Sequence, residues 1–255
     1  MEVFNKNTLL NKKILITGAS SGIGAYCAKE FAKYGAELIL VGRNDIKLNE
    51  VRSSLENPKL HLVYRADLSE IDSGFEMICN LPEEKLPLDG IFHSAGKELI
   101  KPINLTKSSD YKLVFSSTVE AAISISRALA KKNIVAKNAS VIFMSSVAAI
   151  SGTPGLSAYS ASKAALIGLT KSLALEFAPR QVRFNTLLSG AVESPMHDRL
   201  LKNLSSKSID EYRSRHPLGF GKKSDISNLS TFLISDASQW ITGSSICIDG
   251  GYSAR

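Results

Sequence analysis

Short apolar runs alternate along the chain with longer segments in which apolar residues recur every three or four positions. The runs are brief, rich in β-branched residues and bounded by glycine or polar turns, which predicts buried parallel strands. The predicted strands are Lys12–Thr17, Glu37–Val41, Leu60–Tyr64, Gly90–His93, Val141–Met144, Val182–Leu188 and Ser245–Ile248. The periodic segments predict helices, of which the clearest after the first strand are Ser109–Lys131, Ala158–Ala178 and Ile226–Ser235. Strands alternating with helices predict an α/β fold with a doubly wound parallel β-sheet and helices on both faces.

Residues 191–224 interrupt this alternation, because they are rich in charge and contain few periodic apolar positions. They follow the sixth predicted strand at the carboxyl edge of the sheet, which is a natural place for a substrate lid. The chain has no internal repeat and no low-complexity linker. At 255 residues it fits one domain, so we expect residues 1–255 to form a single unit.

A glycine-rich turn follows the first predicted strand and opens the first helix. It reads G-A-S-S-G-I-G, and its glycines permit a tight exit from the strand and a close approach of the backbone to a pyrophosphate. The helix amino terminus then presents free N–H groups and its dipole to the phosphates. This context predicts a Rossmann-type dinucleotide site, although a structural turn without a ligand is the alternative. The expected cofactor contacts here are Gly18, Ser20, Ser21, Gly22, Ile23 and Gly24.

A tyrosine and a lysine lie four residues apart in the predicted helix Ala158–Ala178. Tyr159 and Lys163 therefore share one helix face, and an ammonium near a phenol is expected to lower the pKa of that phenol. Such a tyrosine is usable as a proton donor or acceptor near neutral pH. Ser146 precedes Tyr159 by thirteen residues and follows a predicted strand, where open α/β sheets place their ligands. The alternative is an exposed aromatic and a lysine that merely share a helix face.

The composition excludes several other classes of function. The net charge is +7, but the lysines are dispersed and form no aromatic-interleaved stripe, so we expect no nucleic-acid partner. The three cysteines are far apart and the four histidines lack metal-ligand spacing, so we expect reduced thiols and no metal site. There is no run of 18 apolar residues and no leader, so we expect no membrane contact and a cytoplasmic location.

Taken together, the motifs resemble the short-chain dehydrogenase/reductase family over about residues 10 to 253. The resemblance rests on T-G-x-x-x-G-x-G, the S-A-G at 94–96, the Ser146, Tyr159 and Lys163 set, and the closing D-G-G. It implies that Tyr159 is the general acid or base, that Ser146 hydrogen-bonds the substrate carbonyl, and that Lys163 binds the nicotinamide ribose and lowers the pKa of the tyrosine. It also implies cofactor contacts from Asp67 and Leu68 near the adenine, Ser94, Ala95 and Gly96 in the turn, and Gly190, Val192 and Ser194 near the nicotinamide.

The end of the second predicted strand bears on the choice of cofactor. NAD enzymes commonly place a carboxylate there, whereas this chain has Arg43 and Asn44. A guanidinium suits the 2′-phosphate of NADP(H), so NAD(H) is the less favoured cofactor. Two alternatives remain: Arg43 is only a surface residue, or Asp45 turns back toward the ribose. For Asp67, the alternative is a helix cap before Leu68.

The chain departs from the family pattern at several positions. Ser94 replaces an asparagine, Ser189 a proline and Ser194 a threonine. Thr118 stands where the family has a fourth catalytic residue, an asparagine that is thought to hold a water in a proton relay. A threonine hydroxyl offers a shorter reach, so turnover is expected to be reduced or the relay rerouted.

The resemblance implies NADPH-dependent reduction of a ketone to an alcohol, with 3-oxoacyl thioesters on acyl carrier protein or coenzyme A as the favoured substrates. Arg180 and Lys137 fall at offsets similar to those of acyl-carrier-protein-binding arginines beside the family's pocket, but both also fit solvated helix-end cations. Lys97, Glu98, His197 and His216 are candidate pocket residues, with a surface role as the alternative for the histidines.

Two other functions remain open: an oxidoreductase of sugars or other small polar ketones, and a cofactor-binding regulatory protein that has lost turnover. We expect a homotetramer or dimer, paired through small and apolar residues of the two longest helices. These residues are Ala121, Ala122, Ala128, Ala161, Ala164, Leu169 and Leu173.

Overall fold

The structure is a computed structural model that describes residues 3–202 and 205–254. Parallel strands form one seven-stranded sheet in the order β3-β2-β1-β4-β5-β6-β7. The strand order reverses between β1 and β4, so their carboxyl ends flank the crevice in which doubly wound sheets bind ligands. The strands are β1 (Lys13–Thr17), β2 (Glu37–Gly42), β3 (Leu62–Arg65), β4 (Leu88–His93), β5 (Val135–Ser146), β6 (Arg183–Ser189) and β7 (Ser245–Ile248).

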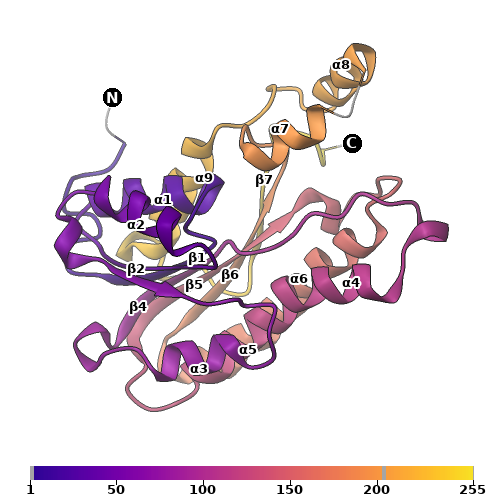
Figure 1. Cartoon of the computed structure of the whole chain (residues 1–255). Helices are drawn as coiled ribbons and strands as arrows, with labels where there is room; N and C mark the ends of the chain where they lie inside the picture. Colours follow the sequence, from indigo (N-terminus) through magenta and orange to yellow (C-terminus); the bar gives the residue numbers. More distant parts are fainter. Residues whose placement is uncertain (1–2, 203–204, 255) are drawn as a thin grey trace.

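Helices cover both faces of the sheet (Figure 1). On one face lie α1 (Gly22–Lys33), α2 (Asp45–Ser53) and α9 (Lys223–Ile234), and on the other lie α3 (Ser73–Cys79), α4 (Ser108–Phe115), α5 (Ala121–Leu129) and α6 (Ser157–Phe177). Successive side chains of a strand point to opposite faces, so Ile14 and Ile16 join one apolar core and Leu15 joins the other. Burial on both faces explains why the strands are continuous apolar runs. The predicted fold class is confirmed.

The predicted long helix Ser109–Lys131 is interrupted. Between α4 and α5 lies a π-helical turn, Ser116–Glu120, in which the backbone hydrogen bonds skip one additional residue. Such turns often occur at functional sites, and this one contains Thr118. Periodicity cannot reveal the turn, because its buried positions, Ser117 and Thr118, are polar and give no apolar signal.

Other boundaries differ from the prediction in length. β5 begins at Val135, well before the predicted Val141, and α2 and α3 were not predicted because their apolar pattern is short. The predicted lid segment contains α7 (Pro195–Leu201) and α8 (Ser206–Ser214), which project beyond one end of the sheet (Figure 1). None of the helices within the described residues is long and apolar enough to cross a membrane.

Most of the residues that were predicted to pair subunits lie inside the chain's own fold. Ala121, Ala122, Ala128 and Leu173 are buried in the chain's own core, so they need no partner subunit to cover them, and this prediction is wrong for them. They face the sheet because the helices bury their small residues against it. The large apolar side chains that these helices expose are Tyr111, Leu113, Ile123 and Leu175. Of the other predicted pairing residues, Ala161 is exposed, and Ala164 and Leu169 are half-buried.

Candidate active site

A cavity of about 390 Å³ opens at the carboxyl ends of β5 and β6. Ser146, the last residue of β5, and Tyr159, in the first turn of α6, both line it. Its opposite wall comes from α7, α8 and the residues that follow them, including Tyr212 and His216. The structure therefore brings two predicted catalytic residues together beneath the predicted lid.

The Ser146 hydroxyl is held by backbone groups. It donates to the Ser189 carbonyl at 3.5 Å and accepts from the Ala148 N–H at 3.2 Å. The residue that replaces the family's proline thus contributes a carbonyl that orients the candidate catalytic serine.

Lys163 lies one turn below Tyr159 on α6 and is almost fully buried. Its ammonium donates to the Met144 carbonyl at 2.7 Å and lies 5.7 Å from the centroid of the Tyr159 ring. Burial lowers the pKa of Lys163 to about 8, so most of the ammonium remains charged at pH 7.

The prediction of a lowered pKa for Tyr159 is wrong in this structure, because that pKa is raised despite the nearby ammonium of Lys163. Desolvation of the phenol is the main cause, and the negative charge of Glu98 adds to it. The Ser146 hydroxyl opposes these effects but does not outweigh them. The phenol therefore stays protonated at neutral pH, in the form that can donate a proton.

Thr118, in the π-helical turn, lies next to the buried lysine. A Cβ atom at residue 96 would lie 3.3 Å from both Lys163 Nζ and Thr118 Oγ1, so Gly96 keeps a small polar space open between these groups. Thr118 Oγ1 is buried, and no group in the described part of the chain hydrogen-bonds to it. An unpaired buried hydroxyl beside an ammonium fits a bound water or a ligand hydroxyl.

His93, at the end of β4, fixes the carbonyl of the π-helical turn. The Ala95 N–H donates to Thr17 Oγ1, which leaves the threonine hydroxyl to donate to His93 Nδ1 at 2.9 Å. The remaining ring nitrogen, Nε2, therefore carries the proton and donates to the Thr118 carbonyl at 3.2 Å. Burial lowers the pKa of His93 to about 4, so the ring stays neutral.

The glycine turn packs as its spacing predicted. Gly18 has φ +68°, and a Cβ there would lie 3.0 Å from the Ala95 nitrogen, so β1 and β4 leave no room for a side chain. A Cβ at Gly24 would lie 2.4 Å from the Gly18 carbonyl oxygen, which explains the close packing of helix and strand. Ser21 is the N-cap of α1 but makes no side-chain capping bond, so the first N–H groups of the helix remain open to an anion.

A second, smaller cavity of about 110 Å³ lies beside this turn. It collects some of the predicted turn and adenine-side residues, together with Lys97 from the loop after β4. Other predicted cofactor contacts do not line it: Ser21, Gly22, Gly24, Asn44 and Ser94. Its lining includes Gly18, Ser20, Arg43, Asp67, Leu68, Ala95, Gly96 and Lys97.

The side chains around Arg43 bear on cofactor choice. Arg43 is exposed, and its Nη1 lies 4.0 Å from Asp67 Oδ2. Asn44 caps α2 by accepting from the Lys47 N–H at 3.0 Å, and the Asp45 carboxylate accepts from Asn49 at 3.1 Å. Asp45 is thus directed along its own helix, whereas Arg43 lines the smaller cavity.

Asp67 does not cap a helix, since residues 68 and 69 form a turn. Its carboxylate instead accepts from the Ser69 N–H and hydroxyl. Desolvation raises the pKa of Asp67, but the Ser69 hydrogen bonds and the charges of Arg43 and Lys97 outweigh it and leave the pKa lowered.

The residues predicted near the nicotinamide line the larger cavity: Gly190, Val192 and Ser194. Val192 pairs with Gly221 in an isolated bridge, and Ser194 caps α7 by accepting from the His197 N–H. Ile23 lines the same cavity, which places the glycine turn and the nicotinamide-side residues around one space.

These features fit a nicotinamide dinucleotide. The open helix terminus suits the pyrophosphate, the cavity beside Arg43 suits the adenosine end, and the unpaired Thr118 hydroxyl beside Lys163 suits a polar group at the ribose. Within the described residues, no group of three histidine, cysteine, aspartate or glutamate side chains is arranged to hold a metal ion.

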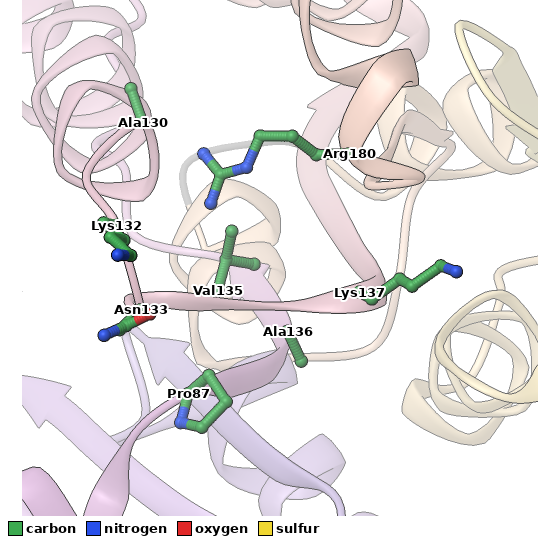
Figure 2. A pocket seen from close by; sticks show the side chains of 8 residues that line it. All are labelled: Pro87, Ala130, Lys132, Asn133, Val135, Ala136, Lys137 and Arg180. Carbon is green, nitrogen blue, oxygen red and sulfur yellow. The ribbon is translucent and has the colours of Figure 1, made fainter.

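Arg180 and Lys137 do not line the cavity that contains Ser146 and Tyr159. They line a separate hollow near the start of β5 (Figure 2), whereas Ser146 is the last residue of that strand. Arg180 donates to the carbonyls of Leu129 and Lys131 at the end of α5, so the alternative of a helix-end cation is confirmed for it.

Sequence reasoning missed part of the cavity wall. Glu98, His197 and His216 were considered and do line the cavity, but Tyr212, Arg215 and Tyr252 were not. The first two lie in the predicted lid, so its position after β6 was the available signal. Tyr252 follows the D-G-G motif, where nothing in the local pattern indicates a pocket residue.

The chain is similar to known oxidoreductases along its length. A family model described as enoyl-(acyl carrier protein) reductase matches residues 18–253. The 3-oxoacyl-(acyl-carrier-protein) reductase FabG of Rickettsia conorii is 34% identical over 245 residues, which are 95% of this chain and 97% of that protein. Gluconate 5-dehydrogenase of Gluconobacter oxydans is 28% identical over 246 residues, with 96% and 95% covered. A solved 4-hydroxyisoleucine dehydrogenase, complexed with NADH, is 31% identical with a TM-score of 0.87 and covers 96% of this chain and 100% of its own.

Proposed function

Because the chain belongs to the short-chain dehydrogenase/reductase family of oxidoreductases, we propose that it reduces a ketone to a secondary alcohol with NADPH. The observation that carries this proposal is that Ser146 and Tyr159 line one cavity, next to a glycine turn that fits a dinucleotide, and that the buried Lys163 lies one turn from Tyr159 on α6. A cofactor-binding protein without turnover would not require this convergence.

In this mechanism the bound cofactor supplies the hydride, and the protein supplies the proton and the orientation. Ser146 hydrogen-bonds the substrate carbonyl and holds it next to Tyr159. Tyr159, protonated because its pKa is raised, donates its proton to the carbonyl oxygen. Lys163 holds its charge beneath the phenol and stabilises the phenolate that forms. A water between Thr118 Oγ1 and Lys163 would then begin reprotonation.

The preference for NADPH rests on Arg43. Its guanidinium lines the adenosine-side cavity together with Ser20, while Asp45 is engaged with Asn49. A guanidinium pairs well with a phosphate, and no carboxylate at the end of β2 competes for the ribose hydroxyl.

Arg43→Ala tests this preference, with Lys47→Ala as the matched control because Lys47 is an exposed cation of α2, the helix that begins two residues after Arg43. Loss of a charge-assisted hydrogen bond should raise the dissociation constant for NADPH about 10- to 100-fold and leave that for NADH nearly unchanged. Equal effects on the two cofactors, or an equal effect of Lys47→Ala, would refute the assignment.

Two substrate classes are supported. The similarity to FabG proteins favours 3-oxoacyl thioesters on acyl carrier protein or coenzyme A. The half-buried carboxylate of Glu98 in the cavity favours a small polar ketone, and two of the similar proteins are named for gluconate and 4-hydroxyisoleucine.

The test is NADPH oxidation, followed by absorbance, with acetoacetyl thioesters and with a panel of polar ketones. Tyr159→Phe should abolish turnover and preserve NADPH binding, because it removes only the proton donor. If wild type binds NADPH but reduces no ketone, the reductase proposal fails and a regulatory role replaces it.

We also propose that the protein is a homo-oligomer, a tetramer or a dimer. The support is the set of apolar side chains that α4, α5 and α6 expose, among which Leu175 is 79% exposed. Light scattering should give a mass of two or four chains. Leu175→Glu should reduce that mass, and a monomer in wild type would refute the proposal.

A further inference from the structure

Two carboxylates line the larger cavity, and one of them, Glu98, is half-buried. Glu98 lies in the loop after β4 and lines the cavity beside apolar side chains such as Ile100, Leu156 and Met196. Glu211 and Arg215 also line the cavity, but both are exposed side chains of the lid. Glu98 is half-buried, so it differs from those two residues in its access to water.

The charge of Glu98 acts on both walls of the cavity. It raises the pKa of Tyr159 on α6 and that of Tyr212 on α8, so its carboxylate lies within electrostatic reach of both phenols. Burial raises the pKa of Glu98 itself, and the charge of Arg199 on α7 partly opposes this.

Among the residues that the structure describes, Glu98 has no partner that satisfies its carboxylate. Across residues 3–202 and 205–254, no group donates a hydrogen bond to it and no cation lies within ion-pairing distance. In the open cavity water can solvate the carboxylate. A substrate that displaces this water must replace its hydrogen bonds or leave a buried charge unpaired, which is costly.

We propose that Glu98 is the specificity-determining residue of this cavity and selects ketones that carry a hydroxyl or ammonium group next to the carbonyl. This inference rests on the proposed ketone reduction and decides between its two substrate classes. The apolar chain of a 3-oxoacyl group would leave the carboxylate unpaired, whereas a hydroxyl or ammonium donates to it directly. A site built to hydrogen-bond a substrate strongly rejects analogues that lack the group.

The test uses three ketones with the same skeleton: 2-butanone, hydroxyacetone and aminoacetone. Wild type should reduce hydroxyacetone and aminoacetone with a higher kcat/KM than 2-butanone. Glu98→Leu should lower the ratio of hydroxyacetone to 2-butanone about 10- to 100-fold, because a hydrogen bond to a charged group is lost. Glu98→Gln should keep activity on hydroxyacetone and lose the preference for aminoacetone, since the amide accepts a hydrogen bond but carries no charge.

Glu211→Leu is the matched control, because this second carboxylate lines the same cavity but remains in water. Glu211→Leu should leave the ratios of kcat/KM among the three ketones unchanged. A wild-type preference for 2-butanone, or an unchanged ratio in Glu98→Leu, would overturn the proposal.

A binding measurement separates this inference from the proposed reduction. Thermal unfolding is followed with NADP present and with 2-butanol, propane-1,2-diol or 1-amino-2-propanol added. If wild type reduces none of the ketones, the two polar alcohols should still raise its Tm more than 2-butanol does, and Glu98→Leu should remove the difference. If the three alcohols raise the Tm of wild type equally, the role of Glu98 is refuted independently of turnover.

Discussion

Replacing Lys163 with methionine tests the buried charge on which the proposed mechanism depends. Lys163 is 5% exposed, and burial lowers its pKa from 10.5 to about 8. Between these two values the unfolded chain binds a proton that the folded chain has released. The free energy of unfolding should therefore rise with pH from about 8 to 10.5, and the contribution is absent in Lys163→Met.

The size of this effect follows from the interval between the two pKa values. At 1.36 kcal/mol per pKa unit, the interval corresponds to about 3 kcal/mol, of which about 2 kcal/mol falls between pH 7 and 9.5. The hydrogen bond from the ammonium to the Met144 carbonyl acts in the opposite sense, because it favours the charged form. Burial outweighs this one bond, since the ammonium has two further N–H groups to satisfy.

Urea unfolding at pH 7 and at pH 9.5 measures how much the free energy of unfolding rises between these pH values. Wild type should gain about 2 kcal/mol more than Lys163→Met between the two pH values. The comparison with the variant cancels the titration of the exposed lysines. If the free energy of unfolding rises equally in wild type and Lys163→Met, the lysine is not desolvated. If it rises less in wild type, the hydrogen bond to the Met144 carbonyl has the larger effect on the pKa.

Two further predictions concern the groups around the π-helical turn. Thr118→Val should leave the free energy of unfolding unchanged or raise it by about 1 kcal/mol, since the hydroxyl it removes is buried without a partner. The same variant should lower kcat about tenfold if that hydroxyl holds the relay water, and parallel losses of stability and kcat would contradict this role. The pKa of His93 is about 4 in the folded chain and 6.5 in the unfolded chain. As the pH falls from 6.5 to 4, the unfolded chain therefore binds a proton at His93 that the folded chain does not bind. Wild type should therefore lose up to about 3 kcal/mol of stability between pH 6.5 and 4, and urea unfolding of His93→Asn should give a shallower loss.

The sequence predicted the sheet and the cofactor turn well, because each has a strong local cause. Strands buried on both faces must be continuous apolar runs, and Ile14 to Ile16 illustrate this. Gly18 has to be glycine because β4 approaches within contact distance of it. Such constraints determine the residue type at the position itself, so they can be recognised in the sequence.

Other features depend on residues that are far apart in the chain, so the local sequence does not reveal them. The π-helical turn around Thr118 is a shift in backbone hydrogen bonding, and its buried positions are polar, so no apolar pattern indicates it. The role of Arg180 depends on carbonyls at the end of α5. The pKa of Tyr159 was predicted in the wrong direction because spacing along α6 reveals Lys163 but neither the burial of the phenol nor Glu98.

The position of Glu98 next to Tyr159 has a consequence for the pH dependence of the reaction. An enzyme cannot change the overall equilibrium, so Glu98 cannot favour reduction over oxidation as such. It can set the pH at which each direction is fastest, because reduction needs the phenol and oxidation needs the phenolate. Glu98 raises the pKa of Tyr159, so oxidation in wild type should increase only toward alkaline pH.

Glu98→Gln removes this charge and keeps the size of the side chain. The pH profile of 2-butanol oxidation should then shift to lower pH, because the phenolate forms more easily without the nearby carboxylate. This alcohol carries no second donor and makes no hydrogen bond to Glu98, so the pH at which its oxidation increases, rather than the rate at one pH, reports the electrostatic effect. Glu211→Gln, at the exposed rim, should leave the profile in place. A profile that is identical in wild type and Glu98→Gln would mean that the carboxylate is screened from the phenol once cofactor is bound, and the coupling inferred between them would be wrong.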